Sequence, residues 1–215
     1  MRSTTLSSLC CLLLCAAGCG AAHTEEDAGL RDAGRARDGG PTVDAGPRSP
    51  LLQVFFTAPV AVGGGVAGFD TACNTSDRRP YPDVEYAALV MSDARRACSS
   101  ANCSDGPDAL DWPLVADGEY GQLDALVFRT DANAIVTEAP ARRLSPVGDE
   151  FNFWSGATGD WTPAPANQCS NWTSRSASEE AVVGWTGEPI DEHFQGGHGL
   201  VPCDMMVRLL CVELP

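Results

Sequence analysis

The last third of the chain contains a distinctive pattern of cysteine and tryptophan residues. Trp172 follows Cys169 by three residues, Cys203 comes about thirty residues later, and Cys211 lies in the apolar run of residues 207–213. An apolar run that holds a cysteine is most simply a buried strand pinned by a disulfide. The sequence therefore predicts that a core strand comes last. The pattern includes no group of residues typical of an active site.

The first residues have the features of an export signal. Arg2 precedes an apolar stretch, residues 6–17, that is too short to span a bilayer, and small residues then precede Cys19. This pattern resembles the lipobox of bacterial lipoproteins, in which the signal peptide is cut before a cysteine that then carries the lipid. The resemblance implies a signal peptide over residues 1–18 and a lipid anchor at Cys19. With Gly20 next, it implies the outer membrane or cell surface.

A small polar linker follows the signal. Residues 19–50 repeat an Asp-Ala-Gly triplet, carry several prolines and have almost no large apolar side chains, so they cannot bury a core. As a flexible coil they span roughly 30 Å, enough to hold a domain off a membrane. The alternative to the anchor is ordinary secretion with cleavage elsewhere, for example after Ala22. Either route leaves one exported domain, residues 51–215.

Export favours disulfides over free thiols. Six cysteines follow the lipobox, an even number, and an oxidising compartment favours their pairing. They are Cys73, Cys98, Cys103, Cys169, Cys203 and Cys211. Six cysteines allow fifteen pairings, and their positions alone do not choose among them. The alternatives are buried thiols or a metal site, but no Cys-x-x-Cys pair occurs and the histidines are not spaced as zinc ligands.

The expected domain is strongly acidic. Residues 51–215 hold 23 acidic and 9 basic residues, hence a net charge of −14, and the chain has no lysine. Such a surface repels nucleic acids, heparin-like polyanions and anionic headgroups, and it favours cations or basic partners. Solubility of an exported domain is a simpler interpretation of this charge than one specific basic partner.

Short apolar runs between long Gly- and Pro-rich stretches predict an α+β domain with few helices. Strands are expected over residues 51–57, 126–128, 151–156, 171–173, 182–185 and 205–212. Asp70 is expected to cap a helix that carries Cys73 in its first turn, and residues 86–91 form the next buried element.

Several short motifs occur in a fixed order along this domain. They are Gly68-Phe-Asp-Thr-Ala-Cys73, Tyr86-Ala-Ala-Leu-Val-Met-Ser92, Asp117-Gly-Glu-Tyr120, Phe153-Trp-Ser-Gly156, Cys169-Ser-Asn-Trp172, Cys203 and Leu210-Cys211-Val-Glu213. Their order and spacing resemble the endostatin-like branch of the C-type-lectin-like fold, and bacterial surface lipoproteins that carry such a domain. The resemblance covers nearly all of residues 51–215. It implies the bridges Cys73–Cys211 and Cys169–Cys203, which leave Cys98 with Cys103.

The resemblance limits the activities that can be carried over. Endostatin binds heparin through surface arginines, whereas this domain is acidic. Sugar-binding C-type lectins hold Ca²⁺ with a Glu-Pro-Asn loop and a Trp-Asn-Asp motif, and only Glu188-Pro189 matches here. Glu188, Asp191 and Glu192 are candidate Ca²⁺ ligands because they offer hard oxygens, with a solvated acidic loop as the alternative.

Tryptophan and serine side chains are the other candidates for ligand binding or chemistry. Trp161 lies in a Gly- and Pro-rich loop, so it is the tryptophan expected on the surface, where it would stack on a ligand; Trp154, Trp172 and Trp185 are expected in the core. No nucleophile-elbow motif accompanies the serines, so we expect no enzyme and no catalytic residue. We also expect no metal site and no cofactor, with Ca²⁺ at the Glu188 loop as the alternative.

The sequence thus favours a non-enzymatic cell-surface lipoprotein that binds a protein or glycan ligand. The expected binding face comprises residues 156–168 and 188–202, where long loops gather. The alternatives are a Ca²⁺-dependent carbohydrate-binding lectin that uses the Glu188 loop, an envelope structural protein, and a hydrolase with an unrecognised site.

Overall fold

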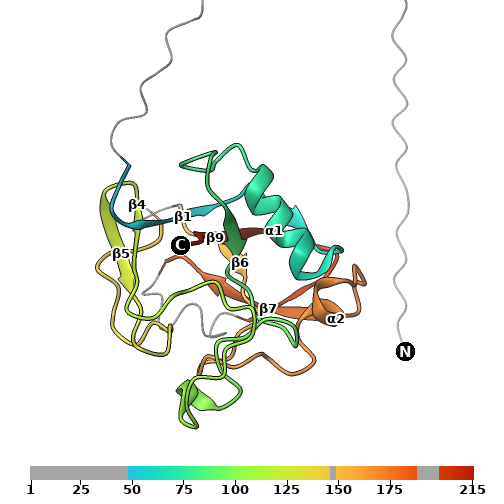
Figure 1. Cartoon of the computed structure of the whole chain (residues 1–215). Helices are drawn as coiled ribbons and strands as arrows, with labels where there is room; N and C mark the ends of the chain where they lie inside the picture. Colours follow the sequence, from blue (N-terminus) through green and yellow to red (C-terminus); the bar gives the residue numbers. More distant parts are fainter. Residues whose placement is uncertain (1–47, 146–148, 188–198) are drawn as a thin grey trace, which may run out of the picture. The chain divides into compact units, whose positions relative to one another are not determined.

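The computed structural model describes residues 48–145, 149–187 and 199–215, all within the unit Gly46–Pro215 (Figure 1). These residues are mostly sheet, with few helices, long loops and disulfides, in agreement with the α+β class. The strands are β1 (Leu52–Phe56), β2 (Val60–Ala61), β3 (Tyr86–Ala88), β4 (Glu119–Gln122), β5 (Ala125–Arg129), β6 (Asn152–Trp154), β7 (Glu180–Trp185), β8 (Leu200–Pro202) and β9 (Met206–Glu213). The helical elements are α1 (Gly65–Thr75), a 3₁₀ turn (Ala101–Cys103) and α2 (Cys169–Trp172).

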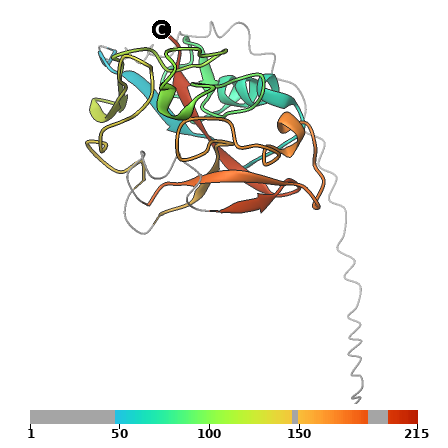
Figure 2. The same ribbon diagram turned by 90° about the horizontal axis from the view of Figure 1, so that it is seen from below.

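The last strand lies at the centre of the sheet. The strand order is β5-β4-β1-β9-β6-β7-β8, and β2 and β3 also pair with β9. Cys211 pairs with Phe55 of β1 and with Ala88 of β3, both antiparallel, while β6 joins the start of β9 in parallel. Figure 2 shows the red strand β9 between α1 on one side and the β4–β5 hairpin on the other. The predicted terminal core strand is therefore confirmed, and its near-continuous apolar sequence follows from burial on both faces of the sheet.

Alternate residues of β9 enter two core clusters, one on each face of the sheet. Leu210 and Val212 belong to the first cluster, which also holds Tyr120 and Phe128. Leu209 and Cys211 belong to the second cluster, under α1. The side chains alternate because successive residues of a strand point to opposite faces. The second cluster also contains Phe69, Trp154 and Trp172.

The N-cap of helix α1 is Gly64, six residues before the expected cap Asp70. Asp70 lies in the middle of α1 rather than at its N-cap, so the predicted start was wrong. Its carboxylate is engaged elsewhere: Oδ1 accepts the backbone N–H of Ala88 at 2.9 Å and a guanidinium N–H of Arg95 at 2.7 Å. The helix instead starts at Gly65, whose φ of +64° is tolerated without a side chain. Phe69 and Cys73 form its buried face.

The described residues form three disulfides. Cys73–Cys211 joins α1 to β9 over a sequence separation of 138, Cys169–Cys203 spans 34 residues and Cys98–Cys103 spans 5. These are the pairs that the resemblance implied. No helix of the described residues is both long and apolar enough to cross a membrane. Cys19, the signal peptide and most of the linker lie outside the described residues.

Candidate functional site

The motif Cys169-Ser-Asn-Trp172 forms a left-handed turn. Its four residues have φ values of 49°, 50°, 55° and 66°, and none of them is glycine. The turn is helical, since the N–H of Trp172 donates to Gln168 O at 2.7 Å and that of Thr173 to Cys169 O at 3.0 Å. Left-handed helical backbone costs L-residues roughly 1–2 kcal/mol each and normally occurs at single positions. The expected strand over residues 171–173 was therefore wrong, and the turn stores strain that its surroundings must hold.

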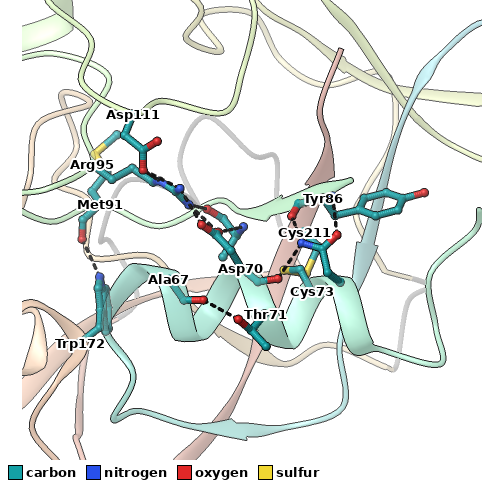
Figure 3. A network of polar contacts seen from close by, with 12 residues as sticks. Ala67, Asp70, Thr71, Cys73, Tyr86, Met91, Arg95, Asp111, Trp172 and Cys211 are labelled. Atoms are coloured by element: carbon teal, nitrogen blue, oxygen red, sulfur yellow. Dashed lines mark hydrogen bonds and ion pairs between the residues drawn. A yellow bond between two sulfur atoms is a disulfide. The ribbon is translucent and has the colours of Figure 1, made fainter. Parts of the chain in front are cut away.

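Two inward-facing anchors hold this turn. Cys169 is bonded to Cys203, and Trp172 is fully buried against Phe69 and Trp154, with ring centroids 5.3 and 5.7 Å away. The indole Nε1–H of Trp172 donates to Met91 O at 3.0 Å (Figure 3). Because residues three apart share one face of a helix, both anchors point inward and the two residues between them point outward. Ser170 and Asn171 are exposed.

A buried arginine fixes the neighbouring segment, residues 92–99. The guanidinium of Arg95 makes a bidentate pair with Asp70 at 2.7 and 2.8 Å, and it donates to Asp111 Oδ2 at 2.6 and 3.0 Å (Figure 3). A further N–H donates to Ala88 O. Burial by itself lowers the pKa of Arg95, but hydrogen bonds and charge from Asp70 and Asp111 outweigh it, so the pKa is raised. Arg95 therefore stays charged and ties this segment to α1.

Three polar side chains stabilise the loop that follows β6. Asp160 Oδ1 accepts hydrogen bonds from the hydroxyls of Thr158 and Thr162, the latter at 2.7 Å. These two bonds, that of Thr158 foremost, hold the pKa of the Asp160 carboxyl below its usual value. The backbone N–H of Asn102 also donates to Asp160 O at 2.7 Å. The cluster orders a loop that carries two prolines and little regular structure.

The left-handed turn, the Arg95 segment and this loop surround a surface pocket of about 790 Å³. We name it the turn pocket. Its lining residues are Asp93, Arg96, Ser99, Thr162, Pro163, Ala164, Pro165, Ala166, Gln168, Ser170, Asn171 and Glu179. Six of them come from residues 156–168, one of the two loop regions in which the sequence predicted a binding face. The other region lies largely outside the described residues.

Hydrogen bonds between neutral donors and carboxylates position the polar groups of the turn pocket. Asn171 Nδ2 donates to Asp93 Oδ2 at 3.0 Å, and Ser170 Oγ donates to Glu179 Oε2 at 2.8 Å. The second oxygen of Glu179 accepts from Ser174 Oγ at 2.9 Å. Among the described residues, neither Asp93 nor Glu179 forms an ion pair, whereas Arg96 lies 3.9 Å from Asp108. The pocket thus presents carboxylate, amide and hydroxyl groups in fixed positions.

The structure corrects one expected site residue and leaves two outside its range. Trp161 is only 1 % exposed and packs near Trp112 in the first core cluster, so its expected surface position was wrong. Contacts from a distant segment bury it, although its own loop is rich in small residues and proline. Glu188 and Asp191, with the rest of the expected Ca²⁺ loop, lie outside the described residues. Within the described ranges, no group of three His, Cys, Asp or Glu is placed to hold a metal ion.

Sequence reasoning missed the lining residues of the turn pocket that lie outside residues 156–168. Ser170 and Asn171 were visible inside the Cys169–Trp172 motif, but the expected strand covered only residues 171–173 and gave neither of them a role. The signal that could have found them is the pair of small polar residues between two core anchors. Asp93 gave no such signal, because its partner is 78 positions away in the chain.

Comparison with known proteins relates most of the described residues to one family. The model of a family described as protein of unknown function (DUF1554) matches residues 57–189. The chain belongs to this DUF1554 family. The DUF1554 match contains every residue that lines the turn pocket. None of the curated proteins matches the chain.

Proposed function

We propose that this DUF1554 protein is a non-enzymatic, lipid-anchored surface protein whose C-type-lectin-like domain binds a glycan in the turn pocket. The observation that carries the proposal is the pocket itself, built on a strained turn that a disulfide and a buried tryptophan hold in place. Backbone strain that the surrounding structure maintains is a recurrent feature of functional sites. The lipid anchor at Cys19 rests on the lipobox, and the fold name rests on the order of the motifs.

The size and chemistry of the turn pocket favour a glycan. Its volume lies within the roughly 300–1,000 Å³ of small-ligand sites, where a few fixed polar groups set specificity. A sugar offers hydroxyls that both donate and accept, together with apolar C–H faces. Asp93 and Glu179 can accept from hydroxyls and Asn171 can donate to them, while residues 163–166 supply an apolar wall of proline and alanine.

Binding without catalysis is favoured by the partners of the Ser170 hydroxyl and of the Glu179 carboxylate. Ser170 Oγ donates to one oxygen of Glu179 and Ser174 Oγ to the other, so both carboxylate oxygens already accept hydrogen bonds. Asp93 and Glu179 are held by side chains that keep them in place as hydrogen-bond acceptors.

A glycan panel tests the proposal. The whole protein is screened against mixed glycans, with Ca²⁺ and with a chelator, and positive glycans are titrated against Glu179→Gln and the matched control Glu138→Gln, an exposed glutamate outside the pocket. Saturable binding whose affinity Glu179→Gln lowers at least tenfold, with unchanged melting temperature, supports the turn pocket as the glycan-binding site.

Other outcomes select the alternatives. Binding that the chelator abolishes and Glu179→Gln leaves intact would favour a Ca²⁺-dependent lectin that uses the Glu188 loop. Release of free sugar from a bound glycan would favour a hydrolase. No binding to any glycan would overturn the glycan proposal.

A further inference from the structure

A second groove lies at the edge of strand β1. Strand β4 pairs with β1 only at Leu52 and Gln53, and no described strand lies opposite residues 54–56 on that side. On the other side, residues 54–56 pair with β9 in full. The space beyond the end of β4 is a pocket of about 820 Å³. Its lining residues are Val54, Phe55, Phe56, Arg78, Pro80, Gln122, Leu123, Leu144, Ser145, Asp149, Glu150, Phe151 and Arg208.

The direction of the backbone groups shows what this edge offers. The N–H groups of Gln53 and Thr57 donate toward β9, to Glu213 Oε2 and Leu209 O, both at 3.1 Å. Backbone groups of successive residues in a strand point to opposite sides, so those of Phe56 point away from β9 and into the groove. An unpaired strand edge is a template for another extended chain.

Side chains from both faces of the sheet border this edge. Leu144 and Phe151 pack with the first core cluster, and Phe151 meets Phe56 edge-on with a centroid distance of 4.8 Å. Arg78 and Pro80 come from the segment that follows α1, and α1 itself packs on the second cluster. The groove therefore lies in the plane of the sheet, where a strand would lie, with an apolar side and a side that carries Arg78.

One exposed leucine stands at the end of β4, at the groove. Leu123 is 66 % exposed and has a φ of 55°, an uncommon backbone conformation for a large side chain. The amide of Gln53 fixes this turn, since Nε2 donates to Leu123 O at 3.1 Å and to Leu51 O at 2.8 Å. The contact holds an apolar side chain at the groove, where a partner could cover it.

Charged side chains also line the groove. Arg208 lies over the Phe151 ring at 4.4 Å and donates to Thr57 O, and neither Arg208 nor Arg78 forms an ion pair with a carboxylate in the described part of the chain. Of the two carboxylates that line the groove, Asp149 and Glu150, Glu150 lies 4.0 Å from Arg143 outside it. With Glu150 paired in this way, the two arginines outnumber Asp149, so the groove carries a net positive charge in a domain that is acidic overall.

We propose that this groove binds an extended segment of another polypeptide, which adds to β1 as a strand. The segment carries apolar side chains toward Phe151 and Leu144, and acidic side chains toward Arg78, in alternation. Backbone hydrogen bonds to Phe56 supply affinity, and the alternating side chains supply specificity, as in other cases of strand addition. The turn pocket shares no lining residue with this groove, so failure of one proposal leaves the other unaffected.

Synthetic peptides test strand addition on the whole protein. The probe is a capped, dye-labelled heptapeptide that alternates valine and glutamate, measured by fluorescence anisotropy at physiological salt. Two analogues carry N-methyl groups, one on every valine and the other on every glutamate. Strand addition uses the N–H groups of either the valines or the glutamates, but not of both. One analogue should therefore bind at least tenfold more weakly, and the other should keep its affinity. The amide of Phe56 should exchange more slowly with the peptide bound.

Matched variants locate the site. Leu123→Glu and Arg78→Glu should each lower the affinity for the peptide at least tenfold. Leu110→Glu and Arg142→Glu, which change exposed residues outside the groove, should leave the affinity unchanged. Equal binding of both N-methyl analogues, tighter binding of a valine–lysine peptide, or no binding at millimolar peptide would overturn the proposal. Self-association of the protein that Leu123→Glu abolishes would also overturn it, in favour of a second copy in the groove.

Discussion

Asn171 and Asp93 exchange two hydrogen bonds at the turn pocket, although 78 positions separate them in the chain. The amide Nδ2 of Asn171 donates to Asp93 Oδ2 at 3.0 Å, and the backbone N–H of Asp93 donates to Asn171 Oδ1 at 3.1 Å. Asn171 has a φ of 55°, and asparagine is among the few residues that tolerate the left-handed region. The pair therefore joins the strained turn to the segment that Arg95 ties to α1.

Glycine at position 170 should give a more stable protein than alanine. Ser170 has a φ of 50°, where glycine is free of the Cβ strain. Because both substitutions lose the bond to Glu179, Ser170→Gly should exceed Ser170→Ala in free energy of unfolding by about 1 kcal/mol after the greater chain entropy of glycine is subtracted. Ser170→Ala keeps the strain and loses the bond to Glu179, and it should lower stability by about 0.5 kcal/mol. Urea unfolding of both variants measures the difference. Equal stability of the two would show that the turn is not strained.

Loss of the buried guanidinium should destabilise the protein strongly. Arg95→Met leaves Asp70 without its cation, and removal of one partner of a buried ion pair costs about 3–5 kcal/mol. The matched control is Arg129→Met, because the pair of Arg129 with Glu119 is exposed and should contribute less than about 1 kcal/mol. Chemical denaturation compares the two. A similar loss in both variants would contradict the structural role of Arg95.

The longest disulfide should contribute most to stability. By chain entropy, the bridge Cys73–Cys211 contributes about 5 kcal/mol and the bridge Cys98–Cys103 about 2 kcal/mol, because the first closes a far longer loop. Double substitution to alanine at each bridge, followed by denaturant unfolding, tests this order. The reverse order would mean that local packing at Cys98–Cys103 outweighs loop length.

Stability should fall in alkaline solution. Burial raises the pKa of Tyr86 and of Tyr120 to about 12, against 10.0 for an ordinary tyrosine. Unfolding therefore releases protons above pH 10, so the stabilisation from both phenols is complete below pH 10 and is lost as pH rises to about 12. Urea unfolding between pH 9 and 12, with phenolate absorbance at 295 nm, measures the decline. Tyr120→Phe should make the decline shallower, and an unchanged slope would contradict the assignment.

Local patterns in the sequence predicted the strands well. The apolar runs at residues 51–57 and 205–212 became β1 and β9, because a strand buried on both faces leaves an unbroken apolar signature. The pairing of the cysteines came from the order of the motifs, and positions alone left fifteen choices. The same reasoning predicted that residues 156–168 contribute to a binding face, and six of them line the turn pocket.

Long-range contacts decided the features that the sequence did not reveal. Trp161 is buried because Trp112, far away in the chain, packs against it, while its own loop suggested exposure. Asp70 lies within a helix because Arg95 and Ala88 use its carboxylate.

The sequence by itself determined the last core strand, the oxidised cysteines and the acidic domain, since each depends on composition or on short apolar patterns. Tertiary structure alone decided the left-handed turn at Ser170 and Asn171, the turn pocket and the open edge of β1. The physical reason is that a strained backbone and an unpaired edge are disfavoured locally. They persist only where a disulfide, a buried indole or a central sheet, assembled from distant segments, holds them.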